Sequence, residues 1–271
     1  LCAVPEMKFG SQPRDGGHFV LTPQERAEIL SHEPTLDAVI KPYIGAEEFL
    51  HNTERYCIWL LNVSPLVIRD SKILREKIAA VEKFRLESRA KTTNQYAKVP
   101  SIFAQIAQPN GHYLLVPRVS SENRRYVPIG FLDENSIASD AVQIVPDATL
   151  FHFGVLTSNV HMAWMRAVAG RLEMRYRYSK ELVYNTFPFP NASEKQIADI
   201  EKAAQAILDE RAKHPEMCLA DLYDPVMIKT TGLNKVHQNL DRAVMAAYGF
   251  TIKGTTEASC VAKLMEMYQE M

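Results

Sequence analysis

The spacing of apolar residues changes twice along this 271-residue chain, and that change most constrains its fold. Residues 71–89 carry apolar side chains at the 3.6-residue period of an amphipathic helix. Short apolar or alternating runs, which are typical of strands, replace this pattern between residues 112 and 146. Helical spacing returns after residue 193. The order predicts an α+β fold: a mixed domain with antiparallel strands and helices, then a small helical domain.

The composition excludes several classes of protein. The formal net charge is −1, so a nucleic-acid surface would have to come from local clusters of charge. No run of eighteen apolar residues occurs, which argues against a membrane protein. The four cysteines have no metal-ligand spacing, so we expect reduced thiols in a cytoplasmic protein. The first residues lack both a signal-peptide pattern and an initiator Met, and we expect a fragment of a longer protein.

Local signals divide the chain more finely. Thr22, Pro23 and Glu25 form the start signature of a helix over residues 22–34. Further predicted elements are helices over residues 71–89, 158–170, 193–215, 239–250 and 256–271, and strands over 55–63, 112–120, 126–132, 140–146 and 172–178. The predicted domains are a connector over 1–22, a mixed domain over 23–190 and a helical domain over 191–271.

The sequence lacks the motifs of a self-sufficient enzyme. It contains no Gly-rich phosphate loop, no Gly-x-Ser-x-Gly elbow and no His pair at a ligand spacing. His161 beside Trp164 is best interpreted as a hydrogen-bonded, partly buried residue, and we expect no metal. Recognition is therefore a better hypothesis than catalysis for this chain.

Basic residues gather in three stretches: 69–98, the polar loop around "SSENRR" at 120–125, and 166–180. A solvated helix face and an ordinary surface turn are equally simple readings of the first two. The loop nevertheless offers both donors and acceptors, as a reader of a DNA groove requires.

Glu173 and Arg175 stand out in the third stretch. On one strand over 172–178, their side chains would project from the same face about 7 Å apart. They could form a weak exposed ion pair. Alternatively, the Arg could donate to guanine while the carboxylate accepts from cytosine, so that together they read one G·C pair.

Several segments together resemble the MmeI-like (type IIL/IIG) restriction–modification enzymes. The longest are "PRVSSENRRYVPIGFL" (117–132), "ATLFHFGVLTSNVHMAWMRAVAGRL" (148–172) and "YRYSKELVYNTFPFP" (176–190). "FGSQPRDGGHFVL" (9–21), "LYDP" (222–225) and "LDRAVMAAYGF" (240–250) extend the resemblance over nearly the whole chain, in order.

The resemblance implies the C-terminal target-recognition region of an adenine-specific DNA methyltransferase. Its partners would be double-stranded DNA and an N-terminal methyltransferase domain, which would bind S-adenosylmethionine; no cofactor and no catalytic residue are expected in this chain. The implied base-reading residues are Glu173, Arg175, Arg177, Asp140 and Ala141. Residues expected to contact DNA from the loop or through the backbone are Arg118, Ser120, Ser121, Glu122, Arg124, Arg125 and Lys180. The alternative function is a protein–protein scaffold or helical interaction module.

Overall fold

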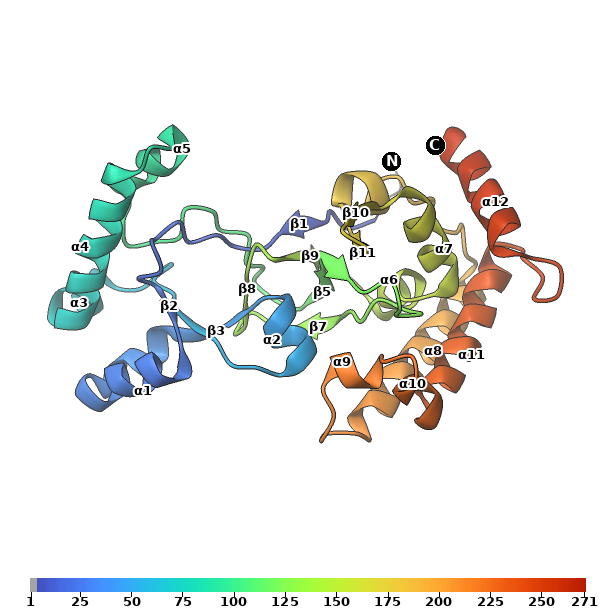
Figure 1. Cartoon of the computed structure of the whole chain (residues 1–271), viewed down its shortest axis with the longest axis horizontal. Coiled ribbons are helices and arrows are strands. Elements are labelled where there is room, and N and C mark those ends of the chain that lie inside the picture. Colours follow the sequence, from blue (N-terminus) through green and yellow to red (C-terminus); the bar gives the residue numbers. More distant parts are fainter. Residues whose placement is uncertain (1–3) are drawn as a thin grey trace. The chain divides into compact units, whose positions relative to one another are not determined.

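The computed structural model describes residues 4–271, and it divides into two compact units. Unit 1 comprises the described residues up to Lys8, Gly111–Leu132 and Gln143–Met271, and unit 2 comprises Phe9–Asn110 and Asp133–Val142. Figure 1 labels the elements of both units. The predicted α+β class is confirmed, because strands of mixed sheets are followed by a run of helices. The division of the sequence into domains at residues 22 and 190 stays a prediction.

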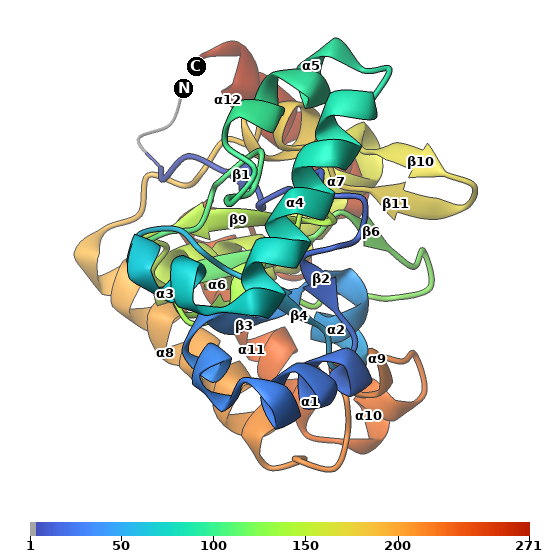
Figure 2. The same cartoon turned by 90° about the vertical axis from the view of Figure 1, so that its left-hand side faces the viewer.

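Unit 2 combines a small sheet with helices that lie between its strands in the sequence. The sheet has the order β2-β4-β3-β8; β4 is antiparallel to β2 and β3, and β8 runs parallel to β3. The elements are β2 (Val20–Leu21), α1 (Pro23–His32), the 3-10 helix η1 (Pro34–Val39), β3 (Ile40–Ile44), α2 (Ala46–His51), β4 (Tyr56–Ile58), α3 (Pro65–Asp70), α4 (Lys72–Glu87), α5 (Lys91–Asn94), the 3-10 helix η2 (Gln95–Lys98) and β8 (Ile137–Ala138). Figure 2 shows α3, α4 and α5 following one another.

An aromatic cluster forms part of the core of unit 2. Phe103 makes edge contacts with Tyr43 and Trp59, with ring centroids 5.8 and 5.0 Å apart, and lies parallel to Phe19 at 6.4 Å. Such pairs stabilise a core beyond their buried area by about 0.5–1.5 kcal/mol each. Leu74 and Val81 of α4 are fully buried in the same cluster of apolar residues, as the 3.6-residue period predicts.

The basic stretch 69–98 is not one solvated helix. It spans α3, α4, α5 and η2, and Arg85 of α4 is fully buried. The Arg85 guanidinium donates to five backbone carbonyls, those of Pro13, Arg14, Tyr96, Val99 and Ile102, at 2.7–3.0 Å. Arg85 therefore fastens two loops of unit 2 to α4, which is a structural role.

Gly10 lies where two backbones of unit 2 pass very close together. A Cβ atom built on Gly10 would stand 2.1 Å from the Ser139 carbonyl oxygen, which is backbone and cannot rotate away. We expect Gly10→Ala to lower the free energy of unfolding by about 1–3 kcal/mol, as overpacking does. Gly111→Ala is the matched control, because a Cβ there meets no atom within 4 Å. Denaturant unfolding of both variants measures the difference, and equal stabilities would contradict the prediction.

Unit 1 combines two sheets with a group of helices. The sheets have the orders β1-β9-β5-β7 and β10-β11-β6. The elements are β1 (Lys8–Phe9), β5 (Tyr113–Pro117), β6 (Val119–Ser120), β7 (Gly130–Leu132), β9 (Val142–Pro146), α6 (Leu150–Leu156), α7 (Asn159–Val168), β10 (Gly170–Leu172), β11 (Arg175–Arg177), the π-helix η3 (Lys180–Tyr184), α8 (Glu194–Ala212), α9 (Leu219–Leu222), α10 (Met227–Thr230), α11 (Leu233–Ala247) and α12 (Glu257–Gln269).

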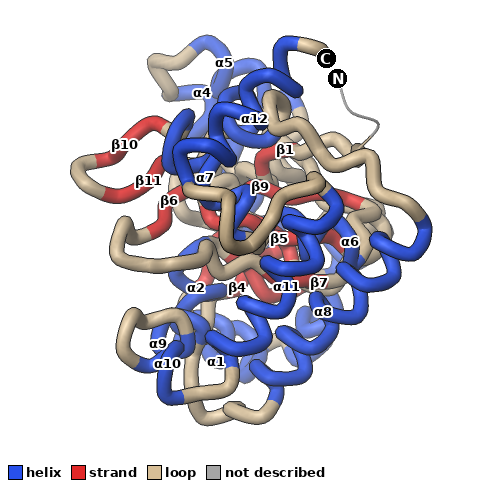
Figure 3. Tube along the Cα trace, turned by 90° about the vertical axis from the view of Figure 1, so that its right-hand side faces the viewer, coloured by secondary structure: helices blue, strands red, loops and turns tan. Residues whose placement is uncertain are grey.

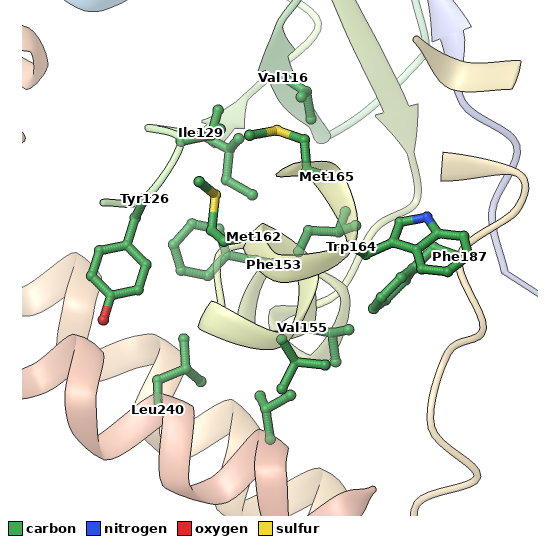
Figure 4. Close-up of a cluster of buried hydrophobic side chains, with 14 of the residues drawn as sticks. Val116, Tyr126, Ile129, Phe153, Val155, Met162, Trp164, Met165, Phe187 and Leu240 are labelled. Atoms are coloured by element: carbon green, nitrogen blue, oxygen red, sulfur yellow. The ribbon is translucent and has the colours of Figure 1, made fainter. Parts of the chain in front are cut away.

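The core of unit 1 gathers around α6 and α7. Figure 4 shows Phe153, Trp164 and Leu240 among its buried apolar side chains. Helix α6 packs closely on α8 and α11, because residue 154 is a glycine without a side chain. A Cβ atom at Gly154 would lie 2.7 Å from Ile200. The Trp164 indole nitrogen donates to the Val183 carbonyl at 3.2 Å, which ties α7 to η3. The core therefore includes both the last predicted helices and the segment that carries the candidate site.

Most predicted elements of unit 1 exist, with shifted bounds. The predicted helix over 239–250 begins earlier, at Leu233, and the predicted strand over 126–132 contains only the short β7. Strand β7 is antiparallel to β5, so residues 118–129, which include "SSENRR", connect the two as the hairpin-like pattern predicts. Helix α6 had no predicted counterpart. No helix of the described chain is long and apolar enough to cross a bilayer.

Candidate nucleic-acid interface

The segment 172–178 forms two strands, so the prediction of one strand was wrong. Strands β10 and β11 pair antiparallel, Gly170 with Arg177 and Leu172 with Arg175, and Glu173 and Met174 form the turn between them. Glu173 has a φ of 57°, the left-handed conformation that tight hairpin turns require. Side chains therefore alternate between two faces within β11. This alternation does not extend across Glu173, because the chain reverses direction there.

The turn nevertheless brings the two predicted charges together. The Glu173 carboxylate and the Arg175 guanidinium lie 2.9 Å apart, with side chains 77 % and 47 % exposed. An ion pair this exposed contributes little to stability, on the order of 0–1 kcal/mol. The pair is thus at the surface with donors and acceptors left over, where a ligand can reach it.

Two buried tyrosines anchor the segment that carries Arg175. Tyr176 and Tyr178 are buried, whereas Arg175 and Arg177, which alternate with them, are exposed on the opposite face. The Tyr178 hydroxyl is 2.9 Å from Nε2 of His161, a residue that is itself buried rather than half-buried as predicted. Burial raises the pKa of Tyr178 and lowers that of His161 to about 3, so both groups are neutral at pH 7. Two aromatic side chains therefore anchor a hairpin strand whose outer face is cationic.

Arg171 of β10 holds the hairpin in shape. Its guanidinium donates to the Met174 carbonyl at 3.0 Å and stacks over the Tyr176 ring at 3.8 Å. One side chain thus contacts both the turn and the anchored strand. Sequence reasoning placed Arg171 in a basic cluster but did not predict this structural role.

The polar loop and the hairpin lie side by side in unit 1, as Figure 3 shows for β6, β10 and β11. Strand β6 pairs antiparallel with β11, Ser120 opposite Tyr176 and Val119 opposite Arg177. The Tyr178 backbone N–H also donates to the Arg118 carbonyl at 2.8 Å. The structure therefore places Ser120 of the predicted loop in one small sheet with Arg175 and Arg177, and Glu173 lies in the turn of the hairpin of that sheet.

The loop residues differ in how accessible they are. Ser120 is buried, while Arg125 is exposed and lies over the Tyr126 ring at 5.4 Å. Ser121 shapes the loop, because its hydroxyl accepts from the Asn123 N–H at 3.2 Å. Burial lowers the pKa of the Arg124 guanidinium. Glu122 and Lys180 are partly exposed, and the Lys180 ammonium lies 3.8 Å from Glu181.

Asp140 and Ala141 belong to unit 2, where they follow β8. Ala141 is exposed, and Asp140 is partly exposed and accepts a hydrogen bond from the Gln12 amide at 2.8 Å. Asp140 is therefore oriented by a neighbour that sequence reasoning did not single out.

Residues 4–271 hold no group of three His, Cys, Asp or Glu side chains arranged as a metal site. Cys57, Cys218 and Cys260 are free thiols, and the predicted thiol at Cys2 lies outside the described residues. The arrangement thus offers exposed charges on a fixed backbone, which suits recognition.

Comparison with known proteins identifies the family. Residues 1–191 match the MmeI target recognition domain, and residues 192–271 match the MmeI C-terminal domain. The chain belongs to the MmeI family. The resemblance stated from the sequence is therefore confirmed at the level of the family.

Two relatives show how far the likeness to the MmeI family extends. DNA methyltransferase A of Bacillus subtilis (strain 168) is 35 % identical over 268 residues, which are 99 % of this chain and 30 % of the relative. A solved structure of the Type IIL restriction-modification enzyme MmeI in complex with DNA matches with a TM-score of 0.95 and 44 % identity, over 99 % of this chain and 36 % of that one. The chain spans about a third of the length of each.

Proposed function

We propose that this chain is the sequence-reading part of an adenine-specific DNA methyltransferase or restriction–modification enzyme. It would bind double-stranded DNA and set the register for a methyltransferase domain elsewhere in the same polypeptide. Family membership, a relative that is a DNA methyltransferase and a similar structure solved with DNA support this proposal. The observation that carries it is the exposed Glu173–Arg175 pair at the tip of an anchored hairpin.

The chemistry of this pair fits one base pair. An arginine fork donates to both acceptors on the major-groove edge of guanine, and a carboxylate accepts from the cytosine amino group. Glu173 and Arg175 are already 2.9 Å apart, so neighbouring bases could engage both with small rotations of the side chains. Because the ion pair is exposed, exchanging it for contacts with bases costs little free energy.

The other predicted residues fill supporting roles. Arg177 is exposed on the same face of β11 as Arg175, which makes it a second base-reading candidate. Asp140 and Ala141 are proposed as base-selecting positions of unit 2. Contacts with phosphates and sugars, which position a protein without reading sequence, are assigned to Arg118, Ser120, Ser121, Glu122, Arg124, Arg125 and Lys180.

The cavity among α7, α11 and α12 offers S-adenosylmethionine no free acceptor carboxylate. This cavity has a volume of about 40 Å³, and the one acidic side chain in its lining is Glu257. That carboxylate is already bound at both oxygens by Arg166, at 2.7 and 3.0 Å, so it is engaged where a nucleoside's ribose would need an acceptor. We therefore assign the cofactor to the methyltransferase domain and derive no chemical step from this chain.

Exchanging the two charges tests the proposal. In the intact polypeptide, the double substitution Glu173→Lys and Arg175→Asp should invert the preferred base pair at one position of the target. The wild-type preference there should be about 5- to 150-fold, the discrimination of a good bidentate contact. The measurement is selection from a pool of duplexes with randomised sequence, followed by sequencing of the bound or methylated fraction.

The matched control exchanges an equally exposed ion pair of unit 1. Lys263 and Glu266 on α12 lie 3.0 Å apart with side chains 53 % and 63 % exposed. Lys263→Glu with Glu266→Lys should leave every base preference unchanged. A folded hairpin variant that enriches the same sequence as the wild type would reject the assignment of these two residues.

A further inference from the structure

Unit 2 contains a chain of polar side chains that ends at Asp140. Arg14 Nε donates to Gln12 Oε1 at 2.8 Å, and Gln12 Nε2 donates to Asp140 Oδ2 at 2.8 Å. All three residues are partly exposed. The chain joins a segment near the N-terminus to a loop more than 120 residues later, and the fold of unit 2 is what brings them together.

The backbone holds this polar chain on both sides. Ser11 forms a parallel bridge with Ser139, and Gln12 forms an antiparallel bridge with Gln105. The N–H of Ser11 donates to the Ala138 carbonyl at 2.7 Å, immediately before the loop that carries Asp140. The positions of Gln12 and Asp140 are thus fixed by main-chain hydrogen bonds as well as by their own contact.

Arg14 has an unusual backbone conformation. Its φ is 46°, in the left-handed region that residues other than glycine seldom occupy. Buried Arg85 donates to the carbonyls of Pro13 and Arg14 at 2.8 and 3.0 Å, which maintains this conformation. The Arg14 guanidinium also lies over the Tyr96 ring at 5.8 Å. Strained residues that their surroundings hold in place often mark binding sites.

The neighbours of Gln12 determine which way its amide faces. An arginine side chain can only donate, so it meets the amide oxygen, and an ionised aspartate can only accept, so it meets the amide nitrogen. Each polar atom of the amide makes one side-chain hydrogen bond and keeps capacity for another: one lone pair on Oε1 and one N–H on Nε2. An acceptor beside a donor complements the N6 amino group and N7 of adenine in the major groove.

We propose that Gln12 reads an adenine in the target sequence and that Arg14 and Asp140 are the residues that orient it. Asp140 would then influence base choice through the amide of Gln12. This inference rests on the proposed function, and it adds a second reading site on a different unit from the hairpin. The position it governs is separate from the one assigned to Glu173 and Arg175.

The test uses the intact polypeptide and the same selection from randomised duplexes. Gln12→Ala should lose the preference for adenine at one position by roughly 5- to 150-fold. The preference governed by Glu173 and Arg175 and the midpoint of thermal unfolding should stay unchanged. Arg14→Ala should weaken the same adenine preference by a smaller factor, and it provides a second test should Gln12→Ala not fold. Gln105→Ala is the matched control, because Gln105 is an exposed glutamine on the segment bridged to Gln12.

The outcomes separate this inference from the proposed function. If the charge exchange in the hairpin inverts one base pair while Gln12→Ala and Arg14→Ala keep every preference, the role of Gln12 is overturned and the proposed function stands. If the wild-type polypeptide enriches no sequence, both fail. Loss of affinity for all sequences alike in Gln12→Ala would also overturn the inference, because a purely structural role predicts that result.

Discussion

Arg85→Met is expected to destabilise unit 2 severely. The side chain is fully buried, and its guanidinium is the donor for five backbone carbonyls from two loops. Methionine fills a similar volume without donors, and each carbonyl left unsatisfied costs about 1–3 kcal/mol. Because water will solvate some of the five, we expect the free energy of unfolding to fall by about 3–5 kcal/mol.

The effect should be local as well as large. Hydrogen exchange should accelerate first in residues 13–15 and 96–102, which the guanidinium holds against α4. Arg89→Met is the matched control, because it removes the same charge from an exposed position just beyond the end of α4. Exchange rates and denaturant midpoints of the two variants decide the matter, and a loss below about 1 kcal/mol for Arg85→Met would contradict this account of the burial.

Local signals predicted the longer helices of this chain, α1, α4, α7, α8, α11 and α12, and missed the shorter ones. Thr22 and Glu25 form the predicted capping box of α1, and Ser193 caps α8 with Gln196 completing the same motif. These interactions join residues three apart, so the sequence contains all the information they need. The register of apolar residues in α4 likewise follows from a period that needs no distant partner.

The hairpin shows where local reasoning fails. The sequence from Leu172 to Tyr178 alternates in a way that fits one strand, but Glu173 adopts a left-handed conformation and reverses the chain. The segment contains no Asn-Gly or Asp-Gly pair, which are the common signs of such a turn. The side chain of Arg171 and the pairing of β11 with β6 support the turn from outside it. The predicted contact between Glu173 and Arg175 exists, although a different backbone produces it.

Contacts between distant residues were beyond prediction from this sequence. The residue type of Arg85 indicates a solvated charge, and only the loops that fold over α4 bury it. The chain from Arg14 through Gln12 to Asp140 depends on a bridge between residues 11 and 139. The base-reading roles assigned to Glu173, Arg175, Arg177, Asp140 and Ala141 stay predictions.

Acidification is expected to destabilise unit 1 strongly, because two neutral histidines are buried in the folded unit. Burial lowers the pKa of His161 to about 3. Burial, together with the positive charges of Arg211 and Arg125, lowers the pKa of His237 well below its usual value. A histidine with a depressed pKa in the folded state takes up its proton on unfolding, so stability falls as the pH drops below about 6.5. His161 alone should cost about 2.3 kcal/mol between pH 6.5 and pH 4.5, and His237 acts in the same direction.

One neighbouring group opposes this trend. Burial raises the pKa of Asp241, whose carboxylate accepts from the Tyr126 hydroxyl at 2.7 Å and from the Asn159 N–H at 2.7 Å. A carboxyl group whose pKa is raised in the folded state stabilises the folded protein as it takes up a proton. Asp241 therefore offsets part of the loss of stability at low pH. The lowered pKa of Glu210 adds to the loss at the acidic end of the range.

Replacing one histidine isolates its share of the effect. His161→Gln keeps a side chain that can hydrogen-bond to the Tyr178 hydroxyl but cannot take up a proton, so its stability should depend less on pH by about one proton. His112→Gln, an exposed histidine of the same unit, should retain the full dependence of the wild type. Urea unfolding at pH 7 and pH 5, followed by the fluorescence of buried Trp164, measures the slopes. Equal slopes for wild type and His161→Gln would mean that His161 is protonated in the folded protein. Its burial against Phe187 at 4.5 Å makes that unfavourable, and so does the single hydrogen-bond partner of its imidazole ring among the described residues.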